Sequence, residues 1–262
     1  MPDSLSQRLG RPAPRYWWLL GTEIISIAAL AFPRAYLINS LSFSAVVVVL
    51  IWVLRTVDTV NTWQRWLDGL YQAMGVALLL SLWGCLVFPD RCSSASLAAL
   101  VLWILFIGWA LLRLLTRLAV PDRVRRSELA GATAGYLLLG LTGGLLLNGM
   151  MLLDPHSLSP LVSGMDNGAL FSQLLHAPSG QGGADTDQLA YLWDVVALDV
   201  IYYGFVALTT LGLGDIVPLT PQAKLLSVGL SVMGTLYLAM VMGVLIARYT
   251  ASLTAGDQLS DG

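Results

Sequence analysis

The sequence predicts an all-α membrane protein, and three observations carry that prediction. Of its 262 residues, 56% are apolar and only 11% carry a charge, against about 45–50% and about 25% in a typical soluble domain. The mean hydropathy is +0.73. Six long apolar runs are poor in charged residues, and each is close to the length of about 20 residues that a transmembrane helix needs. These predicted spans are residues 16–32, 36–54, 70–88, 95–112, 129–153 and 223–247.

A seventh apolar stretch, residues 195–208, is shorter than a span and ends in a glycine-rich turn. Irregular backbone at membrane depth is tolerated only where it lines water or is buried in protein. We therefore expect a re-entrant half-helix between the fifth and sixth spans, followed by a segment that faces an aqueous axis.

The basic residues predict the orientation of the chain. With the N-terminus inside, only Arg34, Arg91 and Lys224 of the 14 lysines and arginines face outward. Short cytoplasmic loops are enriched in these residues, so both termini are expected in the cytoplasm. The first span carries Glu23 and an Ala29-x-Ala31 pattern that resembles a signal-peptidase site, so the sequence leaves its retention or cleavage open.

The string Thr209-Thr-Leu-Gly-Leu-Gly-Asp215 follows the half-helix. Glycine adopts positive φ at no steric cost, so alternating glycines allow successive carbonyls to point the same way. Such carbonyls, with a threonine hydroxyl, can replace the hydration shell of a monovalent cation, and the C-terminal end of the half-helix favours positive charge there. The predicted cation-binding residues are Thr210, Leu211, Gly212, Leu213 and Gly214.

This string, TTLGLGD, resembles the signature of potassium channels, commonly written TTVGYGD. The chain is similar, over residues 129–249, to members of the tetrameric potassium-channel superfamily with six-span subunits. The resemblance implies a potassium-selective channel that conducts K⁺ passively, with K⁺ held at Thr210, Leu211, Gly212 and Leu213 and no other cofactor. One motif per chain and a ring of about four copies imply a homotetramer.

The sequence departs from that signature at Leu213, which stands where the family has a tyrosine that bonds behind the filter. Tyr202 and Tyr203 stand where the family often has two tryptophans. We expect Thr209, Asp215 and these two tyrosines to support the filter, with Tyr203 as the donor to Asp215. A GLG filter also resembles the second pore loop of some two-pore-domain potassium channels. A poorly selective monovalent cation pore and a subunit of a channel-like cation transporter are the alternatives.

The resemblance and the charge pattern together divide the chain into five parts. They are a cytoplasmic N-terminus (1–15), four peripheral helices (16–112), an inner-surface linker (113–128), the pore domain (129–249) and a short cytoplasmic tail (250–262). The linker is read either as an amphipathic helix on the membrane surface or as a charged loop.

A voltage sensor needs several arginines inside the fourth span. Arg113 and Arg117 lie only at its cytoplasmic end, so we read them as interface anchors and expect weak or absent voltage gating. Gly234, about 20 residues past the filter, is the candidate hinge of the inner helix. Gating is expected to be intrinsic, lipid-linked or supplied by a regulatory subunit.

Other function classes find no support in the sequence. HExxH, GxSxG and paired intramembrane carboxylates are absent, so an enzyme is not expected, and nothing points to nucleic acid. Cys85 and Cys92 lie near the expected outer face and allow at most one disulfide. We expect an integral multi-pass protein of a bacterial inner (plasma) membrane, in contact with membrane lipid.

Overall fold

Helices form the architecture in the part of the chain that the structure describes. The computed structural model describes residues 16–32, 36–54, 62–87, 92–119, 126–159, 161, 166–169 and 184–258. Its elements are α2 (Tyr16–Ala29), α3 (Tyr36–Leu54), α4 (Thr62–Val87), α5 (Cys92–Ala119), α6 (Arg126–Leu153), the 3-10 turn η2 (Pro155–Ser157), α8 (Ala184–Leu208), α9 (Pro221–Leu236), the π-helical segment η3 (Tyr237–Met242) and α10 (Gly243–Gln258).

Four helical segments are long and apolar enough to cross a membrane: Leu37–Leu54, Ala98–Leu118, Ser127–Leu153 and Pro221–Ala251. They agree with the predicted second, fourth, fifth and sixth spans and make the chain a multi-pass membrane protein. The predicted first and third spans coincide with α2, which has 14 residues, and with the second half of α4. Neither is among the four.

Two helices of the pore half of the chain are longer than expected. The sequence predicted a half-helix over residues 195–208, whereas α8 has 25 residues and begins at Ala184. The stretch 184–194 contains no glycine or proline, the two residue types that most disfavour a helix, so the helix starts in the polar segment. Its apolar part, Val196–Leu208, is too short to cross a membrane. The last helix likewise continues to Gln258 through residues expected in the tail.

Residues 113–119, expected at the start of a separate linker, continue α5 without a break, and α6 already begins at Arg126. The sequence from Arg113 to Ala119 consists mainly of leucine and arginine, which are strong helix formers. Residues 120–125, including Pro121, lie outside the described residues, as do the side chains of Cys85 and Cys92.

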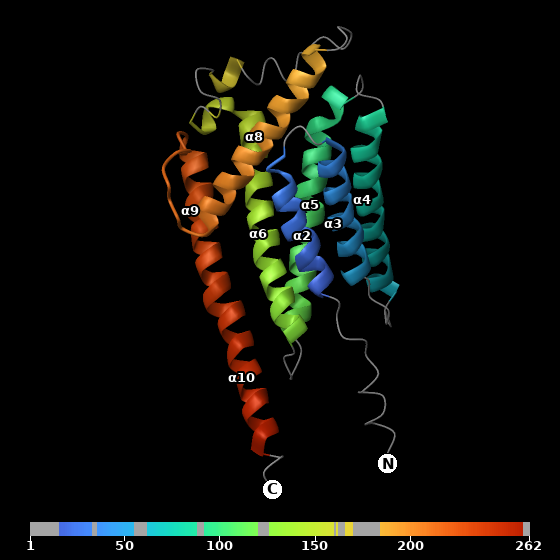
Figure 1. Ribbon diagram of the computed structural model, residues 1–262, viewed down its shortest axis with the longest axis vertical. Coiled ribbons are helices and arrows are strands. Elements are labelled where there is room, and N and C mark those ends of the chain that lie inside the picture. Colours follow the sequence, from blue (N-terminus) through green and yellow to red (C-terminus); the bar gives the residue numbers. More distant parts are fainter. Residues whose placement is uncertain are drawn as a thin grey trace.

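Helix α6 is the centre of the fold, since it contacts α2, α5, α8, α9, η3 and α10. Figure 1 shows α8 entering beside α6 from the upper end of the molecule and stopping partway down, next to α9. The two backbones meet where a Cβ on Gly204 would lie only 2.7 Å from the backbone nitrogen of Gly144. A larger residue at either position would force α8 away from α6.

Two arginines of α5 fasten it to the other peripheral helices. Arg113 Nη1 lies 2.6 Å from Asp68 Oδ1 of α4, and its guanidinium stacks on the Tyr71 ring at 4.8 Å. Arg117 donates hydrogen bonds to the carbonyls of Val53 and Leu54 at 2.8 and 2.7 Å. These carbonyls end α3, where a cation also complements the helix dipole. Both arginines therefore join helices together.

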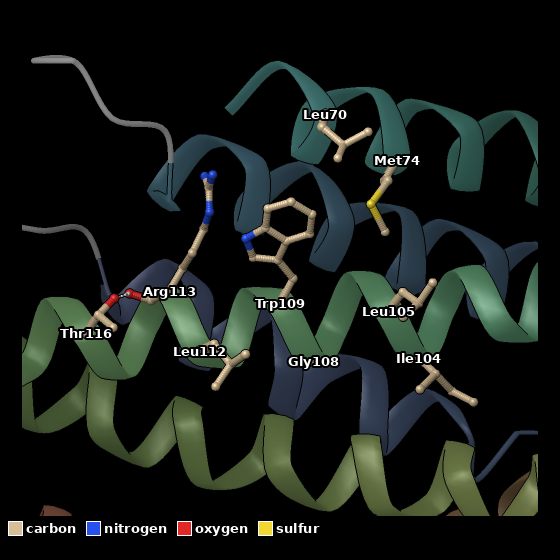
Figure 2. Close-up of a pocket in the computed structure, with 9 residues that line it drawn as sticks. All are labelled: Leu70, Met74, Ile104, Leu105, Gly108, Trp109, Leu112, Arg113 and Thr116. Carbon is tan, nitrogen blue, oxygen red and sulfur yellow. Dashed lines mark hydrogen bonds between the residues drawn. The ribbon is translucent and has the colours of Figure 1, made fainter. Parts of the chain in front are cut away.

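An apolar pocket of about 640 Å³ lies between α4 and α5 (Figure 2). Trp109 and Arg113 stand side by side on α5 in Figure 2, and Leu70 and Met74 come from α4. Its lining comes from these two helices, so the pocket belongs to the peripheral part of the chain; the lining residues are Leu70, Met74, Ile104, Leu105, Gly108, Trp109, Leu112, Arg113 and Thr116.

Candidate ion-conducting segment

The predicted cation-binding residues lie in the filter segment, residues 209–215, which begins where α8 ends. The helix ends in a Schellman arrangement, in which the Leu211 amide donates to the carbonyl of Val206 at 3.0 Å and the Thr210 amide to that of Ala207 at 3.1 Å. Thr210 takes the left-handed conformation with φ 57°. That position usually holds glycine, and another residue there costs about 1–2 kcal/mol.

Positive φ recurs at every second residue of the filter segment. After Thr210, Gly212 has φ 57° and Gly214 has φ 81°; these are the described residues of the chain with positive φ. An ordinary extended strand alternates the direction of its carbonyls, and a left-handed residue at every second position removes that alternation. The backbone thus has the conformational pattern that the sequence predicted for a row of carbonyls on one side.

One hydrogen bond ties the outer end of the filter segment to α8. The Tyr202 hydroxyl donates to Asp215 Oδ2 at 2.7 Å. This bond holds the pKa of the Asp215 carboxyl below its usual range, because it stabilises the charged form. The expectation that Tyr203 would be the donor is wrong. Neighbouring helical residues point about 100° apart, and Tyr203 faces α9 instead.

Tyr203 belongs to a buried polar contact between α8 and α9 that sequence analysis missed. Its hydroxyl lies 2.8 Å from Ser227 Oγ. Ser231, one turn further along α9, donates to the carbonyl of Ala207 at 2.7 Å. The only signal in the sequence is the spacing of these serines, four apart on an otherwise apolar helix. Together these bonds hold the last turn of α8, and with it the start of the filter segment, against α9.

Gly234, the candidate hinge, lies inside the regular part of α9. A Cβ at this position would overlap the carbonyl oxygen of Leu208 and lie 3.0 Å from its carbonyl carbon. The lack of a side chain therefore permits close contact between α9 and the end of α8. The irregular part of the inner helix is η3, which begins three residues later.

The chain after the filter segment is held by the segment that follows α6. The Ser159 amide donates to the carbonyl of Val217 at 2.9 Å, and the Val217 amide donates back to Ser159 Oγ at 3.1 Å. Asn167 is buried and donates to the carbonyl of Leu158 at 3.0 Å. Neither Ser159 nor Asn167 carries a sequence pattern that would single it out.

Within the described residues, no group of three or more His, Cys, Asp or Glu side chains could hold a metal ion.

Comparison with known proteins identifies a family of ion channels. Residues 186–251, from the first turn of α8 into α10, match the model of a family described as an ion channel. The chain matches no curated protein and no solved structure. The matched residues contain α8, the filter segment, α9 and η3. The match supports a pore-loop ion channel.

Proposed function

We propose that four copies of this chain form a channel that conducts K⁺ passively, with the backbone of residues 210–214 as its selectivity filter. The observation that carries the proposal is the alternation of positive φ at Thr210, Gly212 and Gly214, directly after a helix that ends partway through the molecule. Carbonyls arranged on one side can replace the hydration shell of K⁺.

The exposure of the filter segment in a single chain supports an assembly of several copies. The side chains of Leu211 and Leu213 are 62% and 59% exposed. The inner helix buries one stripe, from Ala223 to Tyr237, and leaves large apolar side chains such as Leu225 exposed. Such a surface is expected to face lipid or other copies of the chain. A homotetramer around the filter axis gives these residues their neighbours.

In this proposal α2 and α4 complete a six-span subunit with both termini in the cytoplasm. The start of α2 and the end of α10 lie at the same end of the molecule (Figure 1). The arginines of α5 hold neighbouring helices together, so we propose weak or absent voltage gating. The membrane is proposed to be a bacterial inner membrane.

A poorly selective cation pore is the second candidate, and Leu213 favours it. A leucine cannot donate a hydrogen bond behind the filter, and its side chain contacts little of its own chain. The outer half of the filter then depends on the Tyr202–Asp215 bond for support.

The two candidates differ in reversal potential. Purified protein in a planar bilayer, with K⁺ on one side and Na⁺ on the other, should give a value near the potassium equilibrium potential. Gly212→Ala should abolish this selectivity, since it puts a Cβ on a residue with φ 57° at a cost of about 1–2 kcal/mol per subunit. Gly84→Ala on α4, where a Cβ would meet nothing within 4 Å, is the matched control. A value near zero in the wild type would favour the poorly selective pore.

A further inference from the structure

Glu23 is a carboxyl buried in the interior of the helical bundle. Its side chain is 0% exposed, and neither carboxyl oxygen has a hydrogen-bond partner among the described residues. An ionised carboxylate without a partner in an apolar interior costs several kcal/mol, and such a group takes up a proton instead. In the arrangement seen here Glu23 is therefore a carboxylic acid.

The buried face of α2 places Glu23 beside α6. Tyr16, Leu19 and Glu23 lie on this face, and the Tyr16 ring packs on α6, 2.9 Å from where a Cβ on Gly131 would be. Both helices run from the lower end of the molecule upward (Figure 1). Glu23, about two turns above Tyr16, thus lies about two turns above Gly131.

The inner helix reaches the same part of α6 through Tyr237. Its buried hydroxyl donates to the carbonyl of Ala132 at 2.7 Å and contacts the Cα side of Gly135. Tyr237 belongs to the same buried cluster as Tyr16 and Leu19 of α2, and Tyr16 and Tyr237 pack on Gly131 and Gly135 of α6, which lie about one turn apart on the same face. Glu23 on α2 and Tyr237 on the inner helix thus lie within about one turn of each other along the same part of α6.

Tyr237 is also the first residue of η3, the π-helical segment. A π-helical turn within an α-helix is often found at functional sites. A π-helical turn contains about one residue more than an α-helical turn. If η3 changed to α-helical hydrogen bonding, the residues on its two sides would rotate relative to each other about the helix axis. Such a change would move the Tyr237 hydroxyl away from Ala132.

We propose that Glu23 is a proton-binding site that controls the inner helix through Tyr237. With its proton bound, Glu23 needs no strong partner, and Tyr237 keeps its bond to Ala132. When the proton leaves to water, the carboxylate requires a donor, and the Tyr237 hydroxyl transfers its hydrogen bond from Ala132 to Glu23. The shift of Tyr237 changes η3 and the part of the inner helix that follows it.

Other titratable groups around Glu23 are few. On its own helix there is Tyr16, and α6 contributes Glu128 and Tyr136; Tyr136 packs against the Tyr237 ring at 5.7 Å between centroids. The described side chains of α3, residues 37–54, include none that titrates. The Tyr237 hydroxyl, which contacts Ala132 and Gly135 of α6, is the donor that the carboxylate would use.

The first test rests on the proposed channel function and measures K⁺ flux into proteoliposomes as a function of pH. Wild-type flux should change about 5- to 150-fold across the titration, the usual range of coupling between two sites. At every pH, the variant Glu23→Gln should show the flux that the wild type shows at low pH. Tyr237→Phe should move the transition to higher pH, because the carboxylate loses its donor. A Glu23→Gln profile equal to that of the wild type would overturn the inference.

The second test needs no current and separates the two proposals. Infrared spectra of the purified protein near neutral pH should contain a protonated-carboxyl band that Glu23→Gln lacks. Hydrogen exchange of peptides covering residues 233–243 should differ between the wild type and Glu23→Gln only at high pH. If the infrared band and the exchange difference are both observed but no K⁺ flux is measured, the proposed function fails and the proton site stands. If the band is missing or exchange is identical at all pH values, the proton site is refuted whatever the flux.

Discussion

Replacing Gly234 with alanine is the sharpest test of how the inner helix supports the filter segment. The new Cβ would overlap the Leu208 carbonyl oxygen and lie 3.0 Å from both the carbonyl carbon and Cδ1 of Leu208, where ordinary contacts are about 3.4–4 Å. The nearest atoms belong to backbone, so α8 and α9 must separate. Overpacking costs about 1–3 kcal/mol, and the better helix propensity of alanine returns up to about 1 kcal/mol.

We therefore expect Gly234→Ala to disfavour the observed contact by about 1–2 kcal/mol per subunit, which lowers its population about five- to thirtyfold. Leu208 is the residue before the filter segment, so the displacement should reduce K⁺ conductance and shift the reversal potential toward zero in planar bilayers.

Gly229→Ala is the matched control on the same helix, because a Cβ there would meet nothing within 4 Å of its own chain. Wild-type conductance and selectivity in Gly234→Ala would refute the reasoning. An equal loss in both variants would also refute it, since the cause would then be the helix and not the contact with Leu208.

Two further predictions follow from single contacts. Tyr202→Phe removes the hydrogen bond that lowers the pKa of Asp215, so that pKa should rise and the block of K⁺ current by external acid should begin at higher pH. Tyr203→Phe should leave this titration unchanged, and an unshifted curve in Tyr202→Phe would contradict the assignment. Arg117→Gln loses two charged hydrogen bonds to the end of α3 and should destabilise the protein by about 2–4 kcal/mol, seen as a lower thermal unfolding temperature. A large change in voltage dependence in this variant, without loss of stability, would show that the arginine senses voltage.

Features set by local sequence were predicted well. The apolar runs of the second, fourth, fifth and sixth predicted spans became helices long enough to cross a membrane, because burial of backbone groups in lipid leaves a helix as the only solution for an unbroken apolar run. The positive φ of Gly212 and Gly214 was expected because residues without a Cβ adopt it at no steric cost. Ends of helices were predicted less well: α8 begins at Ala184, since its first residues, 184–188, are mostly polar and carry no apolar pattern that marks them as helical.

Contacts between helices could not be predicted in the same way. Which tyrosine reaches Asp215 depends on the rotation of α8 about its axis, and the pair Tyr202 and Tyr203 looks equivalent in the sequence. Gly234 has the spacing expected of a hinge, but its close approach to Leu208 exists only because α8 stops where α9 passes it. Ser227 and Ser231 of α9 support the last turn of α8 for the same reason, because their partners lie on α8.

The sequence alone was sufficient for the membrane character of the chain and for the positive φ of Gly212 and Gly214, because apolar length and the freedom of glycine act within a few residues. Folding brought Glu23 and Tyr237, more than 200 residues apart in the sequence, to the same part of α6. No local pattern links these two side chains, since their proximity results from the packing of α2, α6 and the inner helix against one another.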